Sequence, residues 1–221
     1  MKLRPGLFQR RECVVPTARG WIALVLAGTG LALTFLFGVY PFLAVNDPRP
    51  GGVLVVEGWA SDEAMRGVID EFHRHPYDAI YATGSAIDES SPFAEYKTFG
   101  EYGAAVLIRL GCDPKVVRAV PSSKVVKDRT YSSAVALKHM LQASGTPVKS
   151  VNVYSMGVHS RRSRLLFQKA FGGETEIGIV AGEAGDFDPR RWWVSSAGFR
   201  NVTDEVIAYL YARFLFHPGA E

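Results

Sequence analysis

The feature that most constrains this chain is a long stretch without charge near its N-terminus. From Gly20 to Asn46 the sequence contains no Asp, Glu, Lys or Arg, and most of its residues are apolar. A bilayer core about 30 Å thick is crossed by roughly 20 apolar residues in a helix. Trp21 and Tyr40 stand near the two ends, where aromatic side chains favour the membrane interface. The stretch therefore predicts a transmembrane helix over residues 20–45.

Two other interpretations of this stretch are open. A cleaved signal peptide has a shorter apolar core and a small-residue cleavage site, and Phe42-Leu43-Ala44 is a poor cleavage signal. A buried core helix is usually shorter and has polar positions on one side. Length and flanking residues favour an uncleaved membrane anchor over both.

The charges before this stretch predict its orientation. Five basic residues and one acid precede it, namely Lys2, Arg4, Arg10, Arg11, Arg19 and Glu12. Positively charged flanks stay on the cytoplasmic side. Residues 1–19 are therefore predicted to be a cytoplasmic tail, with the rest of the chain on the far side of the membrane.

The same charges account for the basic character of the protein. The formal charge of +3 divides into +4 over residues 1–45 (five bases, one acid) and −1 over the remainder (20 bases, 21 acids). A nucleic-acid-binding domain usually carries a basic patch of its own, so we predict no nucleic-acid partner. Cys13 and Cys112 lie on opposite sides of the predicted helix, which excludes a disulfide within the domain.

The remaining sequence predicts one α/β domain over residues 53–217, after a linker at 46–52 that is rich in proline and glycine. Short apolar runs alternate with segments of helical periodicity, which indicates βαβ units and a mostly parallel sheet covered on both faces. We predict strands over residues 53–56, 79–82, 116–120, 151–155 and 177–180. We predict helices over residues 61–74, 95–110, 130–142, 160–171 and 202–216.

Ligands in such sheets bind at the carboxyl ends of the strands, and chemically active residues follow several of the predicted strands. The candidates for a ligand site are Glu57, Gly58, Trp59, Thr83, Gly84, Asp128, Arg129, Thr130, His159, Arg161 and Arg162. A glycine after a strand permits a sharp turn or the close approach of a ligand.

Three arginines in the first turn of the helix after the fourth strand are unfavourable for its dipole. Arg161, Arg162 and Arg164 stand where the helix N-terminus is already positive. A phosphate, carboxylate or sulfate bound there would compensate them. Pairing with acids elsewhere in the domain, or exposure to solvent, would also do so.

His159 directly precedes this helix and titrates near neutrality, so it is a candidate general acid or base. A structural hydrogen bond is the more common role of a lone histidine. Glu57 is a candidate to orient it or to bind a cation, and Asp128 is another. The sequence has none of the common metal-ligand or nucleophile motifs, so we predict no metal ligands and identify no cofactor. Trp192 and Trp193 either hold a ring-shaped ligand or pack against the protein or the membrane.

Together these motifs resemble a family of membrane-anchored envelope proteins that includes YdcF, SanA and ElyC. Gly58, Thr83-Gly84, Thr130 and His159-x-x-Arg162 match its motifs in order and spacing over most of residues 53–215. Glu101 matches a helix glutamate of the family, and Glu205 resembles a late glutamate. Ser132-Ser133 stand where the family usually has Glu-Asn, and Glu57-Gly58-Trp59 replaces a glycine run.

The resemblance implies a Rossmann-like three-layer domain, the bacterial inner membrane, and a role in envelope integrity and cell-wall precursor metabolism. It adds Glu101 to the expected ligand-binding residues. Three hypotheses follow. The protein is an enzyme acting on an anionic, phosphate-bearing substrate such as a lipid-linked glycan precursor, a non-catalytic module that binds a nucleotide-like or glycan ligand, or a scaffold for protein partners.

Overall fold

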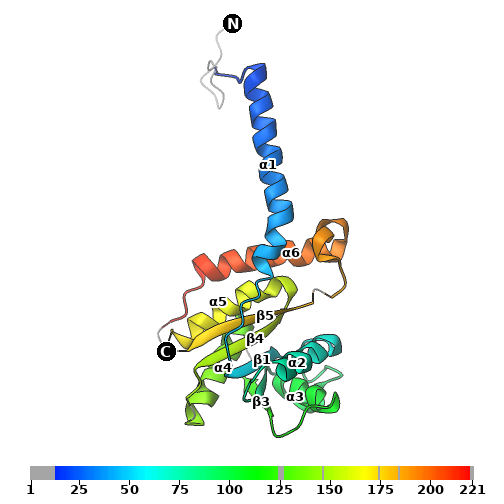
Figure 1. Ribbon diagram of the computed structural model, residues 1–221, viewed down its shortest axis with the longest axis vertical. Helices are drawn as coiled ribbons and strands as arrows, with labels where there is room; N and C mark the ends of the chain where they lie inside the picture. The colour runs from blue at the N-terminus through cyan, green and yellow to red at the C-terminus, as the bar shows by residue number, and fades with distance from the viewer. Residues whose placement is uncertain (1–12, 124–126, 146, 174, 184, 220–221) are drawn as a thin grey trace, which may run out of the picture. The chain divides into compact units, whose positions relative to one another are not determined.

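The computed structural model describes residues 13–123, 127–145, 147–173, 175–183 and 185–219 (Figure 1). The chain forms two compact units, divided after Gly38. The first unit consists mainly of the N-terminal helix, and the second unit is the α/β domain together with the last turn of that helix. We describe each unit by itself.

The N-terminal helix α1 runs from Ala18 to Leu43. Its 26 residues have a mean hydropathy of 2.2 over the most apolar window, and at 1.5 Å per residue they extend about 39 Å. Within the described part of the chain it is the one helix long and apolar enough to cross a membrane. Pro41 lies inside its last turn, and the helix ends two residues later.

The domain is built on a five-stranded sheet whose neighbouring strands are all parallel, with the order β3-β2-β1-β4-β5. The strands are β1 (Val53–Glu57), β2 (Ile80–Ser85), β3 (Val117–Ser122), β4 (Ser150–Met156) and β5 (Glu176–Gly182). The order reverses between β1 and β4, as in doubly wound dinucleotide-binding folds. The predicted α/β fold with a parallel sheet is confirmed.

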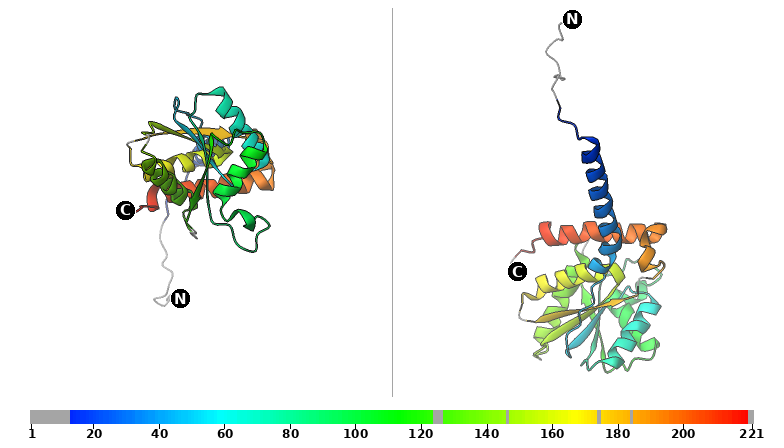
Figure 2. Two further views of the ribbon diagram at one scale, coloured as in Figure 1. Left: turned by 90° about the horizontal axis from the view of Figure 1, so that it is seen from below. Right: turned by 45° about the horizontal axis from the view of Figure 1, so that its top comes forward.

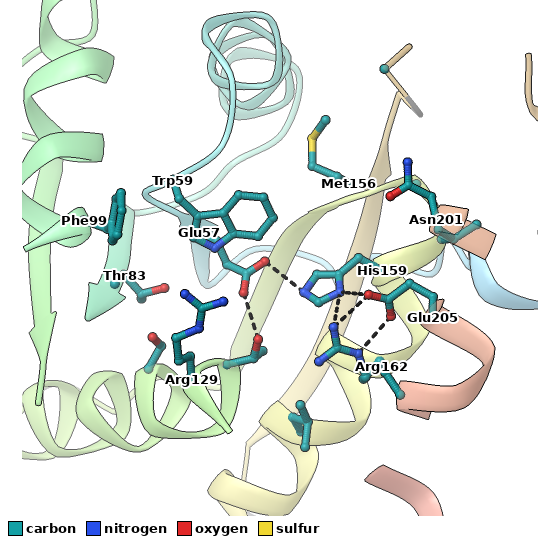
Figure 3. Close-up of a pocket in the computed structure, with 18 of the residues that line it drawn as sticks. Glu57, Trp59, Thr83, Phe99, Arg129, Met156, His159, Arg162, Asn201 and Glu205 are labelled. Atoms are coloured by element: carbon teal, nitrogen blue, oxygen red, sulfur yellow. Dashed lines mark hydrogen bonds and ion pairs between the residues drawn. The ribbon is translucent and has the colours of Figure 1, made fainter. Parts of the chain in front are cut away.

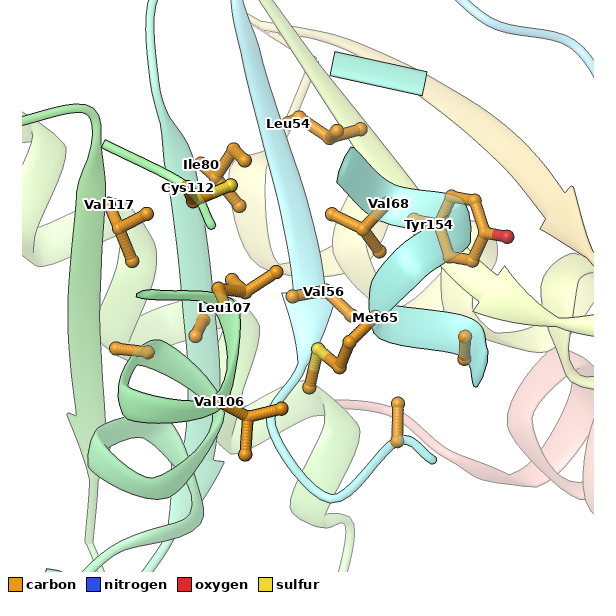
Figure 4. Packing of buried hydrophobic residues seen from close by; sticks show 14 of the residues in the cluster. Leu54, Val56, Met65, Val68, Ile80, Val106, Leu107, Cys112, Val117 and Tyr154 are labelled. Carbon is orange, nitrogen blue, oxygen red and sulfur yellow. The ribbon is translucent and has the colours of Figure 1, made fainter. Parts of the chain in front are cut away.

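Two helices cover each face of the sheet (Figure 2). On one face lie α2 (Asp62–Arg74) and α3 (Phe99–Arg109), and on the other lie α4 (Arg129–Ala143) and α5 (Ser160–Phe171). All five residues of β1 are buried because both faces of the central strand are covered. Leu54 and Val56 pack with Met65 of α2 and Leu107 of α3, as Figure 4 shows. Val53 and Val55 belong to the core on the α4 and α5 side.

Helix α3 begins later than predicted. Instead of one helix from residue 95, a 3₁₀ turn over Ala94–Tyr96 is followed by Lys97 with a φ of 58°. Thr98 then caps α3, because its hydroxyl accepts a hydrogen bond from the Glu101 backbone and the Glu101 carboxylate accepts one from the Thr98 backbone. This capping box sets the start of α3.

The last helix, α6 (Ser196–Leu210), begins six residues before the predicted start at residue 202 and passes into a π-helical turn over Tyr211–Leu215. The Ser195 hydroxyl caps it by accepting a hydrogen bond from the Gly198 backbone. Apolar periodicity indicated only the C-terminal part of this helix, since its first turn consists of small residues, glycine among them, before Phe199.

The segment predicted as a linker is hydrogen-bonded to the domain. The Asn152 side chain accepts from the Arg49 backbone N–H at 2.6 Å and donates to the Arg49 and Gly51 carbonyl oxygens. Asp47 forms a bridge with Ile179 of β5. The chain therefore runs from the end of α1 along the domain to β1.

Candidate functional site

A cavity of about 1070 Å³ opens at the carboxyl ends of the strands, next to the point where the strand order reverses. Parallel strands diverge there, and the fold leaves a crevice that ligands commonly occupy. Most of the predicted site residues line it: Glu57, Trp59, Thr83, Gly84, Asp128, Arg129, Thr130, His159 and Arg162. These residues come from four separate segments of the chain, at the ends of β1 and β2, at the start of α4, and around the start of α5.

Glu57 ends β1 on the floor of the cavity, with only 7% of its surface exposed. One of its carboxylate oxygens accepts a hydrogen bond of 3.0 Å from the Thr130 hydroxyl. The other lies 3.2 Å from Nε2 of His159 (Figure 3). The Nε2 atom is buried without an aligned hydrogen bond to any described residue, so this contact is an ion pair with poor hydrogen-bond geometry.

His159 stands in a short 3₁₀ turn between β4 and α5, and its side chain is 12% exposed. Its Nδ1 atom lies 2.8 Å from Oε1 of Glu205 and 2.8 Å from Nη2 of Arg162. A protonated Nδ1 donates to Glu205, in which case the Arg162 nitrogen is a neighbouring cation and not a donor to the ring. The imidazole is thus held between two carboxylates.

Glu205 lies on α6 and is paired with both His159 and Arg162. Its Oε2 accepts a hydrogen bond of 2.8 Å from Nε of Arg162, and its Oε1 accepts one of 2.8 Å from Nη2. This paired geometry matches the planar guanidinium to the carboxylate. The residues predicted for the site from the sequence did not include Glu205, whose one sequence signal is its resemblance to a late glutamate of the family.

The charges of this cluster shift the pKa of each member. Burial opposes charge on His159, but attraction to Glu57 and the hydrogen bond to Glu205 prevail and raise its pKa to about 9. Burial would raise the pKa of Glu205, yet hydrogen bonds from Arg162 and His159 lower it to about 2. Burial would also raise the pKa of Glu57, but the charge of His159 keeps the pKa of this carboxylate below its ordinary value. At neutral pH His159 is therefore an imidazolium between two ionised carboxylates.

Gly58 and Gly84 are required by packing against α3. A Cβ atom at Gly58 would lie 1.9 Å from the Phe99 carbonyl oxygen, and one at Gly84 would lie 2.5 Å from the Phe99 Cβ. Gly103 of α3 approaches Gly58 in turn, since its Cβ would lie 2.5 Å from the Gly58 Cα. Gly58, just after β1, and Gly84, near the end of β2, therefore allow α3 to pack closely against the sheet, where the sequence indicated a turn or a ligand.

The start of α4 supplies the opposite wall of the cavity. Asp128 has a left-handed backbone (φ 53°, ψ 39°) and no side-chain capping bond, which is an unusual conformation for a residue other than glycine. Arg129 is exposed at the cavity, and no hydrogen bond or ion pair joins it to another described side chain. Thr130 is buried and bonded to Glu57, while Thr83 on β2 donates to the Val56 carbonyl oxygen.

The other two arginines near the start of α5 contact residues outside the cavity. Arg161 donates to the Phe42 carbonyl oxygen and stacks over the Phe42 ring at 4.0 Å. Arg164 forms an ion pair of 2.7 Å with Asp47. Of the three, Arg162 alone reaches the cavity, and Glu205 compensates it. Pairing within the domain, the alternative to a bound anion, thus accounts for Arg162 and Arg164.

Three further predicted residues lie as follows. Glu101 caps α3 and is not among the residues that line the cavity. Trp59 is half exposed at the cavity, with its ring edge-on to His159 at 6.2 Å. Trp192 is 1% exposed and stacks on Phe199 at 6.0 Å, so it packs within the protein and does not hold a ligand ring.

Additional residues complete the lining, notably Phe99, Met156, Asp186, Asn201 and Ala208. Met156 ends β4 and Asp186 lies in the loop after β5, while Asn201 and Ala208 line the cavity because one face of α6 closes it. Within the described segments, no group of three or more His, Cys, Asp or Glu side chains is arranged to hold a metal ion.

Comparison of the chain with family models, with curated proteins and with solved structures finds no match.

Proposed function

We propose that the domain is an enzyme that acts on a phosphate-bearing substrate at this cavity, with His159 as the proton donor. The observation that carries the proposal is that the His159 imidazolium lies between the carboxylates of Glu57 and Glu205, where the strand order of the sheet reverses. Perturbed pKa values in a cleft are typical of catalytic groups. A histidine whose pKa is near 9 keeps its proton at neutral pH and can release it to a departing oxygen.

The phosphate is assigned to the Arg129 side of the cavity. His159 and Arg162 are both compensated by carboxylates, whereas Arg129 has no such partner among the described residues. The first residues of α4 line the same region, and a helix N-terminus favours an anion. Glu57 holds the imidazolium in place, and its low pKa makes it a weak base, so we assign it a positioning role.

Turnover of candidate substrates by the full chain in nanodiscs tests this proposal. The substrates are a lipid-linked diphosphate sugar, a sugar phosphate and a nucleotide. His159→Asn should lower kcat about 100-fold or more, and Arg129→Ala should mainly raise KM. Arg161→Ala is the matched control, because this arginine contacts Phe42 and should leave both constants unchanged. Full activity in His159→Asn would contradict the proposal.

A binding module without turnover is the second candidate. Among the described residues, those that line the cavity and carry charge comprise five acids (Glu57, Glu63, Asp128, Asp186, Glu205) and three cations (Arg129, His159, Arg162), a formal charge of −2. Surplus carboxylates suit ligands with several hydroxyl groups, such as nucleosides or sugars. A ligand at about 100 times its Kd adds about 2.7 kcal/mol to stability. Stabilisation of the chain without consumption of any compound would support the module over the enzyme.

We further propose that the protein belongs to the envelope family of YdcF, SanA and ElyC, and that it is anchored in a bacterial inner membrane. Its tail would lie in the cytoplasm and its domain outside. The motif order supports this assignment, as does the excess of basic residues before α1. Exposed Cys13 should then resist a membrane-impermeant maleimide in intact spheroplasts. Cysteine at exposed Lys115 should react, and the opposite pattern would reverse the orientation.

A further inference from the structure

Helix α6 has two faces of opposite character. Asn201, Glu205 and Ala208 line the cavity. The opposite face, which we call the outer face, consists of Phe199, Ile207, Leu210 and Phe214, with exposed fractions of 52%, 67%, 47% and 65%. The helical spacing of 3.6 residues places these four large apolar side chains in one stripe. Exposed apolar surfaces of this kind mark sites of protein or membrane interaction.

The end of α1 packs beside this stripe, within the same compact unit. The Phe42 ring meets the Tyr209 ring of α6 edge-on at 5.6 Å, and Phe42 is itself 46% exposed. The next residue, Leu43, is fully buried in the domain. Residues 39–43, the last residues of α1, belong to the same compact unit as α6. The segment that leads into the predicted membrane span therefore meets the domain beside α6.

Basic side chains border the outer face. Arg200 and Arg213 are exposed on α6 and its π-helical continuation, where Asp204 is the exposed acid of the same segment. Arg161 lies over the Phe42 ring. Helices that lie in a membrane interface combine a large apolar face with flanking Lys or Arg residues, which meet the lipid headgroups.

We propose that the outer face of α6 lies in the headgroup region of the same bilayer that α1 spans. The protein would then hold its membrane by two helices, one crossing and one lying flat. Continuity with the end of α1 favours the bilayer over a second copy of the chain as the occupant. The proposal does not depend on the chemistry of the cavity, so it can fail or hold independently of the proposed enzyme.

Depth-dependent fluorescence quenching on the full chain tests the proposal. The background is Cys13→Ser with Cys112→Ala, reconstituted in nanodiscs of phosphatidylcholine and phosphatidylglycerol. A single environment-sensitive dye is attached through Ile207→Cys or Phe214→Cys. Lys115→Cys, which is exposed just before β3 at the opposite edge of the sheet, provides the control. Quenchers are a shallow nitroxide lipid and aqueous iodide.

We expect dyes at positions 207 and 214 to be quenched by the nitroxide lipid and protected from iodide, with the reverse at 115. Adding Leu210→Glu to the Phe214 label should reduce the lipid quenching without lowering the melting temperature, because Leu210 is exposed. Equal iodide quenching at all three sites would overturn the proposal. Protection from both quenchers, with energy transfer between labelled chains, would overturn it in favour of a second copy.

Discussion

The Nδ1 atom of His159 lies 2.8 Å from Oε1 of Glu205, which joins the end of β4 to the middle of α6 across 46 residues of chain. The same carboxylate pairs with Arg162 one turn further along α5. Glu205 therefore orients both cations and ties α6 to the sheet edge. Disturbing this one side chain should change the stability of the domain and the ionisation of the site together.

Glu205→Gln should destabilise the domain by about 3 kcal/mol, because it leaves the largely buried Arg162 without its carboxylate and His159 with Glu57 alone. Asp62→Asn is the matched control. Asp62 also pairs with an arginine, Arg109, but both side chains are more than half exposed, and such pairs contribute less than about 1 kcal/mol. Denaturant unfolding of the full chain in detergent, followed by tryptophan fluorescence, measures both. Equal losses in the two variants would contradict a central role for Glu205.

The free energy of unfolding of the domain should decrease in both alkaline and acidic solution. The pKa of His159 is raised from 6.5 to about 9, so its contribution is complete below 6.5 and is lost as pH rises through 9. The pKa of Glu205 is lowered from 4.5 to about 2, so its contribution is complete above 4.5 and is lost as pH falls through 2.

Melting temperatures of the wild type and His159→Gln between pH 5 and 10 isolate the histidine and its two carboxylates, because groups outside this cluster titrate alike in both. The difference between the two should shrink between about pH 6.5 and 9, the interval between the unfolded and folded pKa values. A difference that stays constant over this interval would mean that His159 is neutral in the folded domain.

Gly58→Ala should destabilise the domain by more than about 2 kcal/mol, since its Cβ would overlap the Phe99 carbonyl and neither backbone can move easily. Gly219→Ala is the control, because its Cβ would meet no atom within 4 Å. Thermal unfolding in detergent compares the two. A tolerated Gly58→Ala would show that α3 can move away from the sheet.

Glu101 should act through the capping box and not through a ligand. Glu101→Gln retains the side-chain acceptor for the Thr98 N–H and should change stability by less than about 0.5 kcal/mol, whereas Glu101→Ala should cost about 1 kcal/mol. Once a ligand is found, its Kd should be the same in both variants. Loss of binding in Glu101→Gln would place its carboxylate in the ligand site after all.

The fold was predictable because each strand and helix carries its own periodicity. The continuous apolar run at Val53–Val56 indicated a strand buried on both faces, and the structure covers both. Helix starts were less predictable, since each depends on one or two capping hydrogen bonds. Thr98 begins α3 and Ser195 begins α6, and neither stands where apolar spacing alone would place a cap.

The site was predictable only as far as the strand-end rule extends. That rule placed Glu57 and His159 at one edge, where the structure brings them within 3.2 Å. It could not show that α6 returns over the edge to add Glu205 and Asn201, because their position depends on tertiary packing. Nor could it separate Arg162 from Arg161, which lie on different sides of the same helical turn.

The cluster of Glu57, His159, Arg162 and Glu205 has no net charge at neutral pH, since two carboxylates balance two cations. An anionic ligand that binds beside this cluster should favour uptake of a proton by the protein from solution. A cationic ligand should favour release of a proton. Ligand affinity would then vary with pH in proportion to that exchange. The heat of binding would likewise vary with the ionisation enthalpy of the buffer, so calorimetry in two buffers can reveal the charge of an unidentified ligand.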